Sequence, residues 1–147
     1  TDSRRGAMTL VDSNVLLDVI QDDPDWADWS GGQLAMAIDR GPVIVNPVIF
    51  AEVALAFDTQ DELDRYFRPS DYVRRELPWS AAMLVAKAFL RYRRSGGTKI
   101  TPLPDFYIGA QAQVEKLTLL TRDPRRYRTY FPGVRLIVPD EDGPRRG

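Results

Sequence analysis

Four acidic residues stand at the ends of predicted strands and helices, where carboxylates can take part in chemistry. Asp12 and Asp123 end apolar strands, Asp105 opens a helix, and Glu52 lies in the second turn of another helix. In a parallel sheet the strand-to-helix turns share one edge, so these four side chains can converge. Close carboxylates repel one another, and a divalent cation removes that conflict. The pattern therefore predicts an acid-held metal site that activates water.

The same acids have a structural alternative. A carboxylate at a helix start often caps the helix and offsets its dipole. Asp12, Asp105 and Asp123 each fit this alternative when they are considered singly. Glu52 fits it less well, because the apolar residues on both sides of it indicate burial. The alternative weakens when the four acids are considered together.

The composition restricts the chemistry further. The chain has 147 residues, no Cys and no His. Thiolate metal sites, cysteine nucleophiles and Ser-His-Asp hydrolysis are therefore excluded. Any metal must be bound by oxygen, which favours Mg²⁺ or Mn²⁺ over Zn²⁺. An enzyme with this composition must work through carboxylates.

Apolar runs and helical periodicity alternate along the chain and predict an α/β fold. Short apolar runs predict four strands. One ends just before Asp12, and the others lie at 43–45, 117–121 and 134–138. Helical spacing, caps and stop signals predict helices after Asp12 and at 26–38, 47–57, 61–67, 80–94 and 106–116. Strands that alternate with helices imply a parallel sheet with right-handed crossovers.

The length predicts one domain. Residues 1–7 are small and charged, and we interpret them as a disordered leader or a cloning remnant before Met8. We expect the folded domain to cover 8–139 and a charged tail to cover 140–147. No apolar run is long enough to span a membrane, and no signal-peptide pattern opens the chain, so we expect a cytoplasmic protein without membrane contact.

Four segments together resemble PIN-domain ribonucleases, most closely the VapC-type toxins of bacterial toxin–antitoxin pairs. They are Val-Asp-Ser-Asn-Val-Leu-Leu-Asp at 11–18, Asn-Pro-Val-Ile-Phe-Ala-Glu-Val at 46–53, Leu-Pro-Asp-Phe-Tyr-Ile-Gly-Ala at 103–110 and Leu-Leu-Thr-Arg-Asp-Pro at 119–124. Each motif alone is unspecific, but all four acids occur in the expected order. The resemblance runs from about Met8 to Pro139. It implies a three-layer PIN-like fold in which a central parallel sheet is flanked by helices.

The resemblance also implies roles for particular residues. Asp12, Glu52, Asp105 and Asp123 would be the catalytic acids that bind Mg²⁺ or Mn²⁺. Two polar residues, Asn14 and Thr121, would orient these ligands through hydrogen bonds. One departure is Gln111, because several members of the family carry His in the corresponding Gly-Ala-X-Ala stretch. We expect this departure to affect substrate contacts rather than the metal ligands.

A basic and aromatic segment follows Asp123. Its proximity to a predicted ligand favours contact with RNA phosphates and bases through Arg122, Arg125, Arg126 and Tyr127. A solvated, charged turn is the alternative. Three tryptophans, Trp26, Trp29 and Trp79, are expected in the core or in an interface.

These observations predict a metal-dependent endoribonuclease, the toxin of a type II toxin–antitoxin pair. The resemblance implies an RNA substrate, a cognate antitoxin as partner, and a homodimer. One alternative is a PIN scaffold that binds RNA or a protein without cleaving. Another is a carboxylate–metal phosphatase that acts on small phosphoesters. A basic groove leading to the acids favours the nuclease over the phosphatase, whose pocket should be small and closed.

Overall fold

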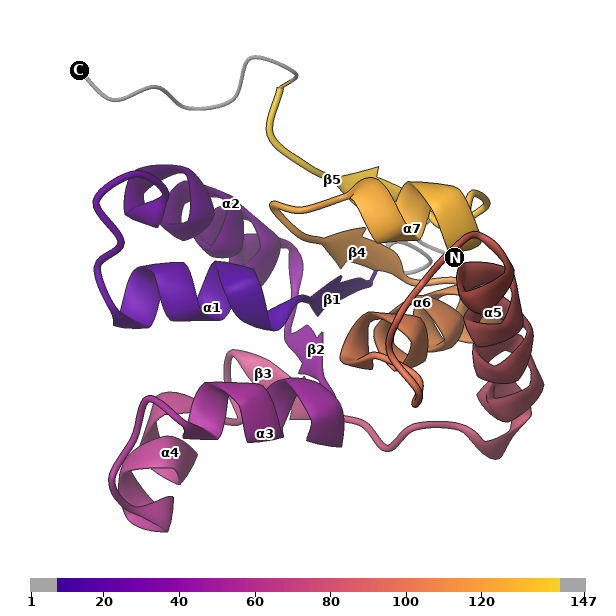
Figure 1. Ribbon diagram of the computed structural model, residues 1–147. Helices are drawn as coiled ribbons and strands as arrows, with labels where there is room; N and C mark the ends of the chain where they lie inside the picture. The colour runs from indigo at the N-terminus through magenta and orange to yellow at the C-terminus, as the bar shows by residue number, and fades with distance from the viewer. Residues whose placement is uncertain (1–7, 141–147) are drawn as a thin grey trace, which may run out of the picture.

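The computed structural model describes residues 8–140 and contains one parallel sheet with helices on both of its faces (Figure 1). Its strands are β1 (Thr9–Val11), β2 (Val43–Val45), β3 (Tyr72–Arg74), β4 (Thr118–Leu120) and β5 (Leu136–Ile137). They lie in the order β3-β2-β1-β4-β5, and all neighbours pair in parallel. The predicted α/β fold with a central parallel sheet is confirmed.

Seven α-helices and one short 3₁₀ helix cover this sheet within the described residues. The α-helices are α1 (Ser13–Ile20), α2 (Ala27–Arg40), α3 (Pro47–Ala54), α4 (Gln60–Tyr66), α5 (Ala82–Arg94), α6 (Pro104–Glu115) and α7 (Arg125–Tyr130), and the 3₁₀ helix is Trp79–Ala81. In Figure 1, α1 and α2 lie on one side of the sheet, and α5 and α6 lie on the other. None of the described helices is long and apolar enough to cross a membrane.

The strand order determines where a ligand can bind. β1 is the central strand, and the chain runs outward from it first toward β3 and later toward β5. The crossovers that leave the carboxyl ends of β1 and β4 therefore diverge and open a crevice between the two strands. Asp12 directly follows β1, and Thr121 directly follows β4. The candidate site accordingly begins at the topological switch point of the sheet.

Local signals explain where the helices that carry the acids begin. Asn46 caps α3, since its Oδ1 accepts a hydrogen bond from the Ile49 amide at 2.8 Å, and Pro47 occupies the first helical position. Asp12 precedes α1 at the same position, and its Oδ1 accepts a hydrogen bond from the amide of the next residue, Ser13, at 2.8 Å. Each helix therefore starts within two residues of the strand before it.

The structure corrects several predicted elements. β3 was not predicted, because this three-residue edge strand ends in Arg74, is followed by Arg75 and has no apolar run that would mark it. The predicted helix 47–57 ends at Ala54, and the predicted strand 134–138 shortens to Leu136–Ile137. The segment 125–131, which was left without a structure, contains α7. The proposed leader at 1–7 and tail residues 141–147 lie outside the described part of the chain.

A close approach between α6 and the end of α7 requires glycine. Gly109 is buried in α6, and a Cβ built on it would lie 2.3 Å from Cδ2 of the Phe131 ring. Phe131 is 3% exposed, so the ring has little room to move away. Gly109 thus allows α6, which carries Asp105, to pack against the segment that follows Tyr127.

We expect Gly109→Ala to lower the free energy of unfolding by about 1–3 kcal/mol, because the added methyl group overpacks this contact. Urea denaturation measures the change. Gly32→Ala is the matched control: it lies inside α2, and its Cβ would have no atom within 4 Å. That substitution should be neutral or stabilising by up to about 1 kcal/mol. Equal effects of the two substitutions would contradict the packing argument.

Candidate active site

Asp12 is the most buried of the four acids, at 4% exposure. Its Oδ1 accepts a hydrogen bond from the Ser13 amide. Its Oδ2 accepts one from the Thr121 hydroxyl at 2.9 Å and one from the Tyr127 hydroxyl at 2.8 Å. The carboxylate is therefore oriented by three donors, which come from α1, the end of β4 and α7.

Burial makes the electrostatics of Asp12 different from those of an exposed carboxylate. Burial, and next to it the charge of Asp105, raise the pKa of Asp12 from 3.8 to about 6, although the three hydrogen bonds act in the opposite direction. Burial also raises the pKa of Tyr127 well above 10, and the Asp12 charge adds to this shift. Tyr127 therefore stays protonated and acts as a donor to Asp12 at neutral pH.

Glu52 reaches the same edge of the sheet from α3. Its Oε1 accepts a hydrogen bond from the Ser13 hydroxyl at 2.8 Å. Burial is the main cause that raises the pKa of Glu52, and repulsion from Asp105 contributes in the same direction. Asp105 therefore interacts electrostatically with both Asp12 and Glu52, as the convergence of strand ends predicts.

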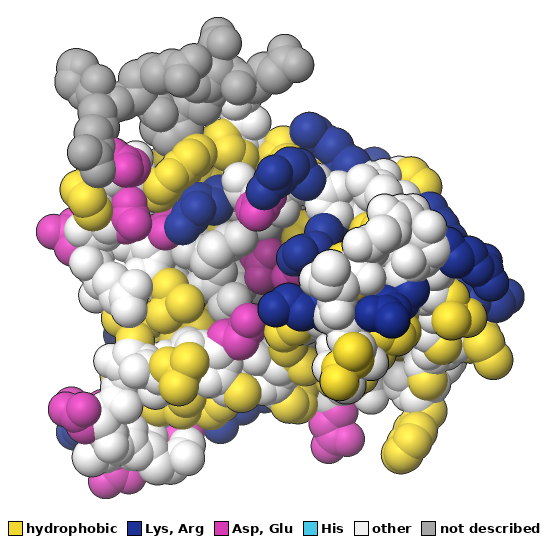
Figure 2. All heavy atoms as spheres, viewed as in Figure 1, with side chains coloured by type: hydrophobic (Ala, Val, Ile, Leu, Met, Phe, Trp, Pro, Cys, Tyr) yellow, Lys and Arg dark blue, Asp and Glu magenta, His cyan; other side chains and the backbone are white. Residues whose placement is uncertain are grey.

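Asp105 and Asp123 lie at the exposed side of the cluster. Together they line an open cavity of about 330 Å³. An arginine from α7 contacts each of them: Arg126 Nη1 lies 3.2 Å from Asp105 Oδ2, and Arg125 Nε lies 3.4 Å from Asp123 Oδ1. Figure 2 shows Lys and Arg side chains gathered beside the acidic side chains near the centre of this face. The outer acids are thus neutralised in part by cations of the chain itself.

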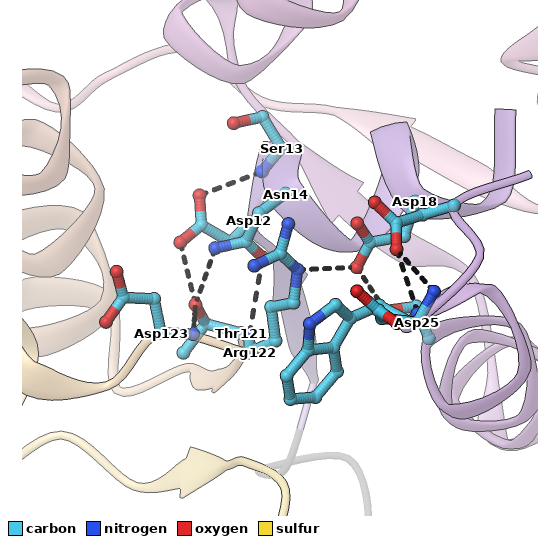
Figure 3. Close-up of polar contacts among 11 residues, drawn as sticks. Asp12, Ser13, Asn14, Asp18, Asp25, Thr121, Arg122 and Asp123 are labelled. Carbon is cyan, nitrogen blue, oxygen red and sulfur yellow. Dashed lines mark hydrogen bonds and ion pairs between the residues drawn. The ribbon is translucent and has the colours of Figure 1, made fainter. Parts of the chain in front are cut away.

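Thr121 connects the inner and outer parts of the site (Figure 3). Its hydroxyl donates to Asp12 and accepts from the Asn14 amide nitrogen at 3.3 Å and from the Asp123 backbone amide at 3.2 Å. Asn14 Oδ1 in turn accepts from the Arg122 amide at 3.3 Å. The two residues expected to support the acids therefore lie in one hydrogen-bond network with Asp12 and with the loop that carries Asp123.

Two of the residues expected to contact RNA have other partners. Tyr127 is 1% exposed, so its ring has no free face for a base, and its hydroxyl holds Asp12 instead. Arg122 Nε lies 2.7 Å from Oδ2 of buried Asp18, and the guanidinium stacks over the Trp26 ring. The predicted base contact of Tyr127 is therefore wrong, because α7 turns its side chain toward the core. Arg125 and Arg126 are exposed at the cavity, as a phosphate contact requires.

Gln111, the departure noted in the sequence, is fully buried and does not face a substrate. Its Oε1 accepts a hydrogen bond from Asn46 Nδ2 at 2.8 Å, and its Nε2 donates to the Glu76 carbonyl and to Glu115, each at 3.1 Å. Since Asn46 caps α3, this amide pair joins α3, which carries Glu52, to α6, which carries Asp105. The expected effect on substrate contacts does not fit this burial.

The carboxylate oxygens present suit a divalent cation, although they do not surround a single position. Within residues 8–140, no three carboxylates are already positioned to hold one metal ion. Asp12 and Asp105 nevertheless repel each other, because Asp105 raises the pKa of Asp12 and Asp12 has no cationic partner among the described residues. Hard oxygen donors with excess negative charge fit Mg²⁺ or Mn²⁺.

A profile of the PIN domain matches residues 9–132 of this chain. The chain belongs to the PIN-domain family. The matched range contains β1 to β4, α1 to α7 and all four acids, so the site described above lies within the family's domain. No curated protein matches the chain.

Solved structures share this PIN fold at low sequence identity. VapBC2 from Rickettsia felis, bound to a DNA fragment from its promoter, has a chain that is 15% identical, with a TM-score of 0.68 over 90% of this chain and 99% of that one. A chain of FitAcB from Neisseria gonorrhoeae is 19% identical, with a TM-score of 0.62 over 88% of this chain and 96% of that one. A chain of DNA-bound VapBC from Salmonella typhimurium is 14% identical, with a TM-score of 0.66 over 90% of this chain and 98% of that one. At these identities the similarity shows the fold alone.

The raised pKa of Asp12 predicts a pH-dependent cost to stability. The folded protein holds the Asp12 proton more tightly than the unfolded chain does. Protonation of Asp12 therefore adds to the free energy of unfolding below pH 3.8, and this stabilisation is lost as the pH rises through about 6. The loss by pH 7 is ~3 kcal/mol. We expect Asp12→Asn to remove it, so that the variant gains stability relative to wild type as the pH rises.

Urea denaturation of both proteins from pH 4 to pH 7 measures this difference. Every other titrating group is common to the two chains, so the change in the difference with pH reports the ionisation of Asp12 together with its coupling to the neighbouring acids. A difference that stays constant over this range would show that Asp12 ionises with its ordinary pKa.

Proposed function

We propose that this PIN domain is a metal-dependent endoribonuclease and the toxin of a type II toxin–antitoxin pair. The observation that carries the proposal is the buried Asp12 carboxylate, which repels Asp105 at the switch point of the sheet. Burying a charge without a counter-charge is costly, and enzymes accept such costs mainly at functional sites. A cation bound between these carboxylates would attract both of them and offset their repulsion.

Asp12, Glu52, Asp105 and Asp123 are the residues that would hold Mg²⁺ or Mn²⁺. When bound, such an ion supplies a hydroxide nucleophile at neutral pH and stabilises charge on the phosphate. The chain's own groups prepare the site: Thr121 and Tyr127 fix Asp12, and Ser13 fixes Glu52. These donors keep the oxygens in place, which lowers the cost of organising the ligands when the ion arrives.

The substrate side of the site favours a polymer over a small phosphoester. The cavity that contains Asp105 and Asp123 is open rather than enclosed, and exposed Arg125 and Arg126 line it. Guanidinium groups bind phosphates in a bidentate way. A cation that takes over the outer acids would release these two arginines beside the scissile phosphate. An open, arginine-lined cavity suits an RNA backbone that continues beyond the reacting group.

The proposed partners follow from the similar structures and from the surface. The similar chains were solved as VapBC and FitAB complexes, which supports a cognate antitoxin for this chain. Trp26 and Trp29 are half-buried, whereas Trp79 is 95% exposed and Met83 64% exposed. Large apolar side chains left in water mark interfaces. We propose that the neighbouring pair Trp79 and Met83 is covered in a homodimer.

A non-cleaving PIN scaffold remains the second candidate, because a specific observation favours it. Arg125 and Arg126 already contact Asp123 and Asp105, which lowers the local need for a metal ion. A scaffold of this kind would bind RNA or a protein through the same surface without hydrolysis. Metal-dependent cleavage separates the two candidates.

We expect Asp12→Asn to abolish Mn²⁺-dependent cleavage of a structured RNA and to weaken Mn²⁺ binding at least tenfold, because it removes the buried anionic ligand. Calorimetric titration of Mn²⁺ and gel analysis of the RNA measure the two effects. The far-UV circular dichroism spectrum should not change, since Asn keeps the size of the side chain and one oxygen that can still accept from the Thr121 and Tyr127 hydroxyls.

Asp39→Asn, an exposed acid in α2, is the control and should leave both signals unchanged. An unfolded Asp12→Asn protein would show that the acid is structural. Wild-type protein that binds Mn²⁺ without cutting RNA would support the scaffold, and a folded wild type with neither signal would overturn the metal site.

A further inference from the structure

A second basic groove lies between α5, the end of α6 and the chain that leads from α7 into β5. Its volume is about 950 Å³, larger than that of the cavity at the acids. Lys87, Arg91, Lys116 and Arg135 line it, and no acidic residue is found among its lining residues in the described part of the chain. The groove is therefore positively charged although the whole protein has a net charge of only -1.

Most of the charges in this groove have no acidic partner in the part of the chain that the structure describes. Lys87, Lys116 and Arg135 are exposed and form no ion pair within residues 8–140. The arginines at the acidic site differ in this respect, since Arg125 and Arg126 each contact a carboxylate there. Three free cations around one groove form an electrostatic site for a ligand with several negative charges.

The groove adjoins the candidate active site. Tyr130 lines both the groove and the cavity that contains Asp105 and Asp123. Arg91 lines the groove and contacts two residues that line the cavity: its guanidinium lies 5.4 Å from the centre of the Tyr130 ring, and its Nη2 donates to the Thr129 carbonyl at 2.9 Å. β4, which runs from the groove to the acidic edge, has only three residues and is about 10 Å long.

We propose that this groove binds the phosphates of single-stranded RNA that extends from the cleavage site. The inference rests on the proposed nuclease function and adds a path for the substrate. A row of cations that follows a backbone, next to a flat aromatic–guanidinium surface, is the arrangement by which proteins bind single strands without reading their sequence. Arg91 stacked on Tyr130 forms that surface at the junction. An acidic peptide would use the cations alone.

The test measures RNA binding without metal, so that cleavage does not interfere. Fluorescence anisotropy in EDTA compares labelled single-stranded RNAs of about 20 and about 4 nucleotides. The groove variant is Lys87→Ala/Arg135→Ala. The control is Arg40→Ala/Arg65→Ala, which removes the same charge from exposed positions in α2 and α4. Both variants avoid every residue placed at the acids.

We expect the groove variant to bind the longer RNA about tenfold more weakly than wild type and to lower the slope of log K against log salt by about 1.4, for two lost phosphate contacts. The short RNA should bind weakly to wild type and to both variants, because it can occupy only part of the path formed by the cavity and the groove. The control should match wild type with both RNAs.

Three outcomes would overturn the proposal. They are unchanged binding of the longer RNA, equal losses in the groove and control variants, and loss of binding to a polyglutamate peptide while RNA binding persists. The last result would identify the groove as a protein-binding site. Failure of the proposed function is separate, since it appears as absent Mn²⁺-dependent cleavage by wild type while length-dependent RNA binding remains.

Discussion

The structure of the site depends on one constraint, which is how a carboxylate can be buried at the end of the central strand. Asp12 follows β1, which has a strand on each side, and the position is buried from water. The charge is tolerated because Ser13, Thr121 and Tyr127 donate hydrogen bonds to it. These donors come from three different elements, so the requirement to satisfy one carboxylate fixes α1, the end of β4 and α7 relative to one another.

The remaining acids are stabilised by a different means. Asp105 and Asp123 are more exposed and have arginine partners, at 3.2 and 3.4 Å. Exposed ion pairs of this length contribute little to stability and exchange easily. The inner acid is therefore held rigidly by neutral donors, whereas the outer acids are held loosely by cations. This division leaves the outer carboxylates accessible to a metal ion and keeps Arg125 and Arg126 close to the position of a substrate phosphate.

Much of this arrangement could be predicted from the sequence because its signals are local. An acid directly after an apolar run, or Asn46-Pro47 at a helix start, specifies a strand-to-helix turn within a few residues. The position of Tyr127 could not be predicted in this way. Its sequence neighbours are arginines, and only the packing of α7 against α6 decides that its side chain is buried. β3 escaped prediction for a similar reason, since its pairing with β2 is determined by contacts distant in sequence.

Gln111 shows how a residue outside the acids can set their spacing. The amide pair Asn46–Gln111 is buried, and every polar atom in it is paired, so shifting α3 against α6 would leave donors and acceptors unsatisfied. These two helices carry Glu52 and Asp105, whose mutual repulsion would otherwise push them apart. A neutral hydrogen-bonded pair resists that repulsion without adding charge to the site. The distance between two of the candidate ligands is thus fixed by an uncharged contact one turn or more away from either of them.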